Sequence, residues 1–94
     1  MTEVKELDML ENYLKTKGIH YTRRYGDIDY GHQIIVFDSH GHRQWDAVCR
    51  PGSYGYEEGL LEVMGDPVVT WKDGDSVVGF LTAQDVIKRL EGNE

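Results

Sequence analysis

Apolar residues recur at helical spacing at the start of the chain, between charged residues. The apolar stripe consists of Val4, Leu7, Leu10 and Leu14. Residues three and four apart share one face of a helix, so this stripe would pack on a core while the charged positions face water. Thr2 is a candidate N-cap, and Lys17 followed by Gly18 is typical of a helix C-terminus. The pattern predicts an amphipathic helix over residues 2–17.

Three runs with strand character follow, at residues 19–25, 33–38 and 43–50. The first places Ile19, Tyr21 and Tyr25 on one face, which we expect to point at the core. The second is apolar on both faces, as is typical of a central strand. The third alternates, and its apolar face carries Trp45, Ala47 and Cys49. A tight connection with Gly41 at a turn position joins the second and third runs, so we predict an antiparallel meander.

Glycine and proline divide residues 51–94 into shorter elements. Residues 56–64 favour a short central helix, closed by Gly65. Two apolar runs, residues 68–71 and 76–80, flank the turn-forming residues 72–75 and so predict a β-hairpin. Thr82, with Asp85 three residues later, predicts a capping box at the start of a last helix.

These elements predict an α+β fold. The N-terminal and C-terminal helices would pack on a mostly antiparallel sheet of about five strands, beside the short central helix. A chain of 94 residues is long enough for one hydrophobic core, so residues 1–94 are expected to form a single domain.

Charge is unevenly distributed along the chain. The formal net charge is −7, and residues 51–94 carry nine acidic and three basic side chains. Such a surface repels phosphate, so we expect nucleic acid to be an unlikely partner. The first residues contain no apolar h-region, so we expect no signal peptide. No apolar run is long enough to span a membrane, and the single cysteine cannot form an internal disulfide. We therefore expect no membrane association and a cytoplasmic location.

Candidate metal-binding and catalytic residues are few. Asp38, His40 and His42 alternate, and a His-x-His pair binds transition metals when both imidazoles project from one strand face. Gly41 places them in a tight connection, so we interpret them as a polar turn and predict no metal and no cofactor. Cys49 lies on the apolar face of its strand, which is typical of a buried thiol rather than a nucleophile. We expect no enzymatic activity.

The most distinctive segment, residues 50–65, contains four glycines and two tyrosines. Tyrosine supplies rigid contact area and glycine supplies unusual backbone shapes, so the combination is typical of a binding loop. A tight connection with its aromatic residues packed on the core explains the segment equally well. For the binding interpretation, the candidate contact residues are Tyr54, Tyr56, Glu57, Glu58 and Glu62.

Much of the C-terminal half resembles a family of small uncharacterised proteins of phages and prophages of Gram-positive bacteria. The resemblance lies in residues 45–49 (WDAVC), 52–62 (GSYGYEEGLLE) and 73–87 (DGDSVVGFLTAQDVI). It implies a phage or prophage origin, and it implies neither an activity nor catalytic residues.

A shorter stretch, residues 67–90, resembles the strand–strand–helix ending of a CBS motif. The threonine and aspartate of that ending commonly contact the ribose of adenine nucleotides. The resemblance would give this role to Thr82 and Asp85, which the helix cap already explains. These motifs work in pairs, and this chain carries one.

The resulting hypothesis is a non-catalytic, phage- or prophage-derived accessory protein. We expect it to bind a host or viral protein through its acidic C-terminal half and its Gly/Tyr loop. The alternative is a small module that binds an adenine nucleotide at Thr82 and Asp85.

Overall fold

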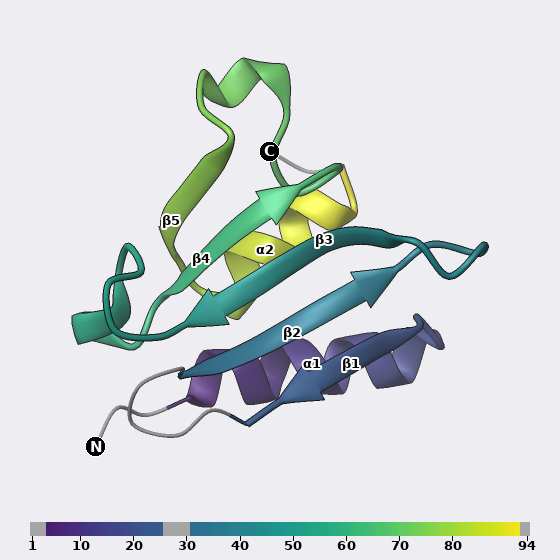
Figure 1. The fold of residues 1–94 in the computed structure, drawn as a ribbon, viewed down its shortest axis with the longest axis horizontal. Coiled ribbons are helices and arrows are strands. Elements are labelled where there is room, and N and C mark those ends of the chain that lie inside the picture. The colour runs from purple at the N-terminus through teal and green to yellow at the C-terminus, as the bar shows by residue number, and fades with distance from the viewer. Residues whose placement is uncertain (1–3, 26–30, 93–94) are drawn as a thin grey trace.

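Five antiparallel strands follow one another across a single sheet in their order along the chain (Figure 1). They are β1 (Tyr21–Arg24), β2 (His32–Phe37), β3 (Arg43–Cys49), β4 (Leu61–Gly65) and β5 (Val77–Leu81). Helices α1 (Lys5–Lys17) and α2 (Ala83–Leu90) both lie behind one face of this sheet. The computed structural model describes residues 4–25 and 31–92. The predicted α+β fold is confirmed.

The core lies between the sheet and the two helices. Its fully buried residues include Leu7, Leu10 and Leu14 of α1, Ala47 and Cys49 of β3, and Leu61 of β4. Those of α1 and β3 belong to the apolar stripe and the apolar strand face expected from the sequence, whereas Leu61 was expected in a helix. Burying a side chain as large as leucine contributes about 1.5–3 kcal/mol, so this shared core fixes both helices to the sheet.

Helix α1 begins later than predicted. Val4 occupies its N-cap position without a side-chain hydrogen bond, and the expected cap, Thr2, lies outside the described residues. The C-terminal end is as predicted. Gly18 adopts a left-handed conformation, with φ of 69°, and donates its N–H to the carbonyls of Leu14 and Lys15.

Strand β1 differs from the prediction on its inner face. Tyr21 packs against the core, but Tyr25 follows the end of the strand and is 71% exposed, so its expected burial is wrong. Arg23 lies on the inner face, and only 4% of its side chain is exposed. Its Nη1 atom pairs with Asp8 at 3.0 Å and with Glu11 at 2.9 Å, both on α1. Alternation puts Arg23 on the same face as Tyr21, and the two carboxylates of α1 compensate its buried charge.

Residues 56–64 do not form the predicted central helix. Residues Tyr56–Glu58 make a single 3₁₀ turn, Gly59 ends it with φ of 72°, and β4 follows. Val63 of β4 lies opposite Ala47 of β3. A short apolar run fits a helix or a strand, and here the hydrogen-bonding edge of β3 selects the strand.

The predicted hairpin around residues 72–75 is also wrong, because its first arm is not a strand. Val68 is buried, and Trp71–Asp73 form a 3₁₀ turn. The second arm does form, as β5, but its partner is β4, with Val77 opposite Met64. The sheet therefore has five strands, with β4 in the place of the strand predicted at residues 68–71.

Candidate functional site

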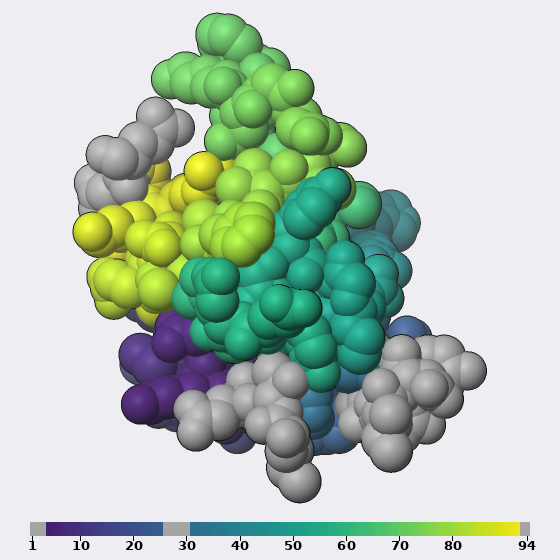
Figure 2. Space-filling model, turned by 90° about the vertical axis from the view of Figure 1, so that its left-hand side faces the viewer, coloured from purple at the N-terminus to yellow at the C-terminus, as the bar shows by residue number. Residues whose placement is uncertain are grey.

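The Gly/Tyr loop, residues 50–60, lies against β5 (Figure 2, teal-green beside yellow-green). Phe80 of β5 donates its backbone N–H to the carbonyl of Tyr54 at 3.2 Å. Gly79 permits this approach, because a Cβ atom at that position would lie 2.2 Å from the Cβ of Tyr54. Gly55 is also confined, though less tightly, since its Cβ would lie 2.9 Å from the Cβ of Leu60 and 3.1 Å from the Cα of Phe80. The loop and the strand are thus in direct backbone contact.

Two aromatic side chains point outward from this contact. Tyr54 is 60% exposed and Phe80 is 57% exposed. Phe80 has φ of 58°, in the left-handed region that favours glycine. This conformation costs an L-residue about 1–2 kcal/mol, and such strain persists only where the surrounding structure enforces it. We call these two side chains the Tyr54/Phe80 patch. Tyr54 is one of the predicted contact residues, whereas Phe80 is not among them.

The other predicted contact residues of the loop have different surroundings. Glu57 and Glu58 are exposed on the 3₁₀ turn beside Tyr54. Tyr56 is partly buried and packs against the core. Glu62 holds the loop in place, because its Oε2 accepts the backbone N–H of Tyr54 at 2.6 Å. The loop therefore has exposed side chains at Tyr54, Glu57 and Glu58, and packed or hydrogen-bonded ones at Tyr56 and Glu62.

Thr82 and Asp85 form the predicted capping box at the start of α2. Thr82 Oγ1 accepts the N–H of Asp85 at 3.1 Å, and Asp85 Oδ2 accepts the N–H of Thr82 at 3.0 Å. The latter bond holds the pKa of Asp85 below its ordinary value. Glu6 of α1 adds a second carboxylate, which accepts the N–H of Ala83 at 2.7 Å. A nucleotide here would compete with these bonds and face two negative charges.

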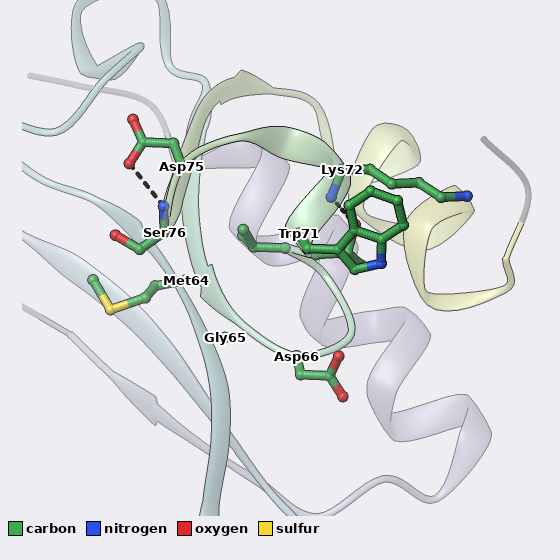
Figure 3. Close-up of a pocket in the computed structure, with 9 residues that line it drawn as sticks. Met64, Gly65, Asp66, Trp71, Lys72, Asp75 and Ser76 are labelled. Carbon is green, nitrogen blue, oxygen red and sulfur yellow. Dashed lines mark hydrogen bonds between the residues drawn. The ribbon is translucent and has the colours of Figure 1, made fainter.

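A hollow of about 790 Å³ lies between β4 and the segment of residues 66–76 (Figure 3). Met64, Val69 and Trp71 give it apolar walls. Asp66 and Asp75 also line it and lie on opposite sides in Figure 3. Trp71 is 87% exposed. Trp71 lies in a 3₁₀ turn and not in the predicted strand, and no local pattern in the sequence indicates this hollow.

The polar turn after β2 is as interpreted from the sequence. Asp38 Oδ1 accepts the N–H groups of His40 and His42, both at 2.9 Å, and the bond from His42 lowers the pKa of Asp38. Within residues 4–25 and 31–92, no group of three or more His, Cys, Asp and Glu side chains is placed to hold a metal ion. Cys49 is a buried free thiol, and burial raises its pKa.

Comparison with known proteins gives no match, whether to a protein-family model, a curated protein or a solved structure. No helix in the part of the chain that the structure describes is long and apolar enough to cross a membrane.

Proposed function

We propose that this protein is a non-catalytic binding module that recognises another protein through the Tyr54/Phe80 patch and the adjacent carboxylates of Glu57 and Glu58. The observation that carries the proposal is the exposed Phe80 held at φ of 58° beside the exposed Tyr54. Aromatic side chains on a fixed backbone contribute most of the binding energy in many interfaces, and they lose little conformational entropy on binding.

The charge around the patch indicates the chemistry of the partner. Glu57 and Glu58 are exposed, and both belong to the acidic stretch of residues 51–94. A complementary surface would carry an apolar depression for the two rings and basic residues at its rim. We place this partner in a phage-infected or lysogenic Gram-positive host, on the sequence resemblance given above.

The cysteine supports a binding role in a reducing cytoplasm. Cys49 is buried with a raised pKa, so at neutral pH it is a protonated thiol out of reach of a substrate. A free thiol is stable in such a compartment.

Affinity capture tests the proposal. The tagged protein is incubated with lysate of the phage-carrying host, and captured proteins are quantified by mass spectrometry. We expect Tyr54→Ser combined with Phe80→Gly to reduce capture of the specific partner about tenfold or more, which is the loss typical of central aromatic contacts. Glu57→Lys with Glu58→Lys should reduce it as well, because both changes reverse the charge of the rim.

The matched control is Tyr25→Ser, which removes a tyrosine that is 71% exposed at the end of β1. It should leave capture unchanged. All variants are checked for a native thermal transition. Capture that is the same for the wild type and both patch variants would rule out this surface as the binding site.

A further inference from the structure

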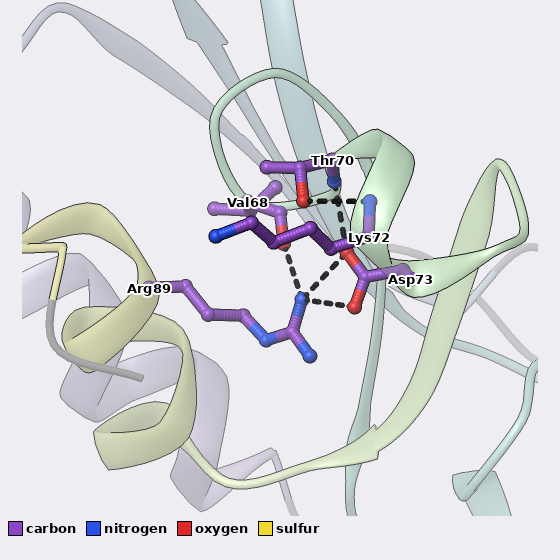
Figure 4. A network of polar contacts seen from close by, with 5 residues as sticks. All are labelled: Val68, Thr70, Lys72, Asp73 and Arg89. Atoms are coloured by element: carbon purple, nitrogen blue, oxygen red, sulfur yellow. Dashed lines mark hydrogen bonds and ion pairs between the residues drawn. The ribbon is translucent and has the colours of Figure 1, made fainter.

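The hollow beside Trp71 is held in a fixed shape. Thr70 and Asp73 cap the 3₁₀ turn that carries Trp71, since the Thr70 N–H donates to Asp73 Oδ2 at 2.8 Å. Arg89 of α2 links this turn to the helix (Figure 4). Its Nη1 donates to the carbonyl of Val68 at 2.8 Å and to both carboxylate oxygens of Asp73 at 3.1 Å. The indole is therefore exposed on an anchored segment, and binding a ligand there requires little ordering.

The lining of the hollow carries a net negative charge, because two aspartates outnumber one lysine. Asp66 and Asp75 line the hollow and are exposed. Asp75 Oδ1 accepts the N–H of Ser76 at 2.7 Å, which leaves its second oxygen to face solvent. Lys72 also lines the hollow, but its side chain runs past the indole and away from Met64 and Asp75 (Figure 3).

We infer that this hollow is a second binding site, separate from the Tyr54/Phe80 patch, and that it takes an arginine side chain from a basic segment of a partner protein. An arginine can stack its planar guanidinium on the indole and donate hydrogen bonds to a carboxylate at the rim. Its aliphatic stem would pack on Met64 and Val69. Charge complementarity selects this occupant, since phosphate or an acidic peptide would be repelled by Asp66 and Asp75.

A short, end-blocked peptide of alternating arginine and glycine is the probe. Binding is followed at low salt by calorimetry and by tryptophan fluorescence. The chain has two tryptophans, and Trp45 is 3% exposed, so a change on peptide addition reports on Trp71. We expect saturable binding that weakens with added salt, and no binding of the same peptide with glutamine in place of arginine.

Two double variants with equal net charge separate a specific site from general acidity. Asp66→Asn with Asp75→Asn should weaken peptide binding about fivefold, on the scale of two exposed charge contacts. Asp8→Asn with Glu91→Gln removes the same charge at two exposed positions outside the hollow and the patch, and should leave the affinity unchanged. Trp71→Ala should weaken binding as well, whereas Lys72→Gln should strengthen it, because it removes a competing cation.

Three results would overturn the inference. One is equal weakening by both double variants, which would mean that arginine is attracted by net charge alone. Another is equal binding of the glutamine peptide, which would mean an apolar groove. The third is self-association that disappears in Asp66→Asn with Asp75→Asn, measured by sedimentation, which would mean that a second copy of the chain fills the hollow. Tyr54→Ser with Phe80→Gly should not affect peptide binding. The proposals for the hollow and for the Tyr54/Phe80 patch are therefore tested independently.

Discussion

Phe80 combines a bulky side chain with a backbone conformation that is usually left to glycine. Its φ is 58°, and its N–H donates to the carbonyl of Tyr54. Gly79 is the residue before it and admits Tyr54 at a distance that no side chain would allow. The strain at Phe80 is therefore supported by the packing of its neighbours, and an aromatic ring is placed in solvent as a result.

Replacing Phe80 by glycine and by alanine measures this strain. Glycine adopts φ of 58° freely, so Phe80→Gly should be more stable than Phe80→Ala by about 1 kcal/mol. The order is opposite to the one expected in an ordinary strand. Urea unfolding gives the two free energies of unfolding.

The same pair of substitutions at Val77, earlier in β5, serves as the reference, since Val77 is not among the positive-φ residues. There the alanine variant should be the more stable. If alanine is also preferred at Phe80, the left-handed conformation contributes no strain, and the ring of Phe80 is not held in solvent by its neighbours.

At the scale of elements, one four-residue pattern starts two helical segments. Thr70 and Asp73 cap the 3₁₀ turn, and Thr82 and Asp85 cap α2. In both cases the aspartate accepts the backbone N–H of the threonine. Each pair satisfies backbone donors that the first turn of a helix leaves unpaired.

Removing the cap hydroxyl of α2 tests its contribution. Thr82→Ala should lower the free energy of unfolding by about 1 kcal/mol, because the N–H of Asp85 loses its acceptor. Thr82→Ser keeps a hydroxyl and should cost less.

Thermal melts of the same variants with and without adenine nucleotides address the alternative role of this pair. We expect no shift, whereas a rise of several degrees that is lost in Asp85→Asn would favour a nucleotide site.

At the scale of the whole molecule, stability depends on carboxylates that bond backbone N–H groups. The N–H of Thr70 lowers the pKa of Asp73, and the N–H of Thr82 lowers that of Asp85. A group with a lower pKa in the folded state than in the unfolded state binds fewer protons when folded. Its contribution is present above the unfolded pKa and is lost as the pH falls through the folded one.

The free energy of unfolding should therefore decrease from about pH 4 downward, where unfolded aspartate begins to take up protons. Urea denaturation at neutral pH and across the acid range measures the slope. Asp73→Asn with Asp85→Asn should give a less stable protein with a flatter acid dependence. The control, Asp66→Asn with Asp75→Asn, removes the same charge from outside the two capping boxes. An unchanged slope in the first variant would contradict this account.

Local signals in the sequence determined the helices and the first three strands. These signals each act within a few residues, so they do not depend on the arrangement of the other elements. They are the stripe of Leu7, Leu10 and Leu14, the left-handed Gly18, and the pair of Thr82 and Asp85. The turn at Asp38 is local in the same way. The Thr70 and Asp73 pair is a local signal of the same kind, but the apolar residues around it favour a strand.

Tertiary structure decided the fourth strand and both candidate sites. Residues 61–65 are apolar enough for a helix or a strand, and only the free edge of β3 makes them β4. Arg23 is buried because two carboxylates of α1 reach it from another element. Phe80 meets Tyr54 through a backbone hydrogen bond between β5 and the Gly/Tyr loop. The 3₁₀ turn that carries Trp71 lines the same hollow as Met64 of β4. Periodicity reports which positions can face a core, whereas partners across the fold fix which side chains meet.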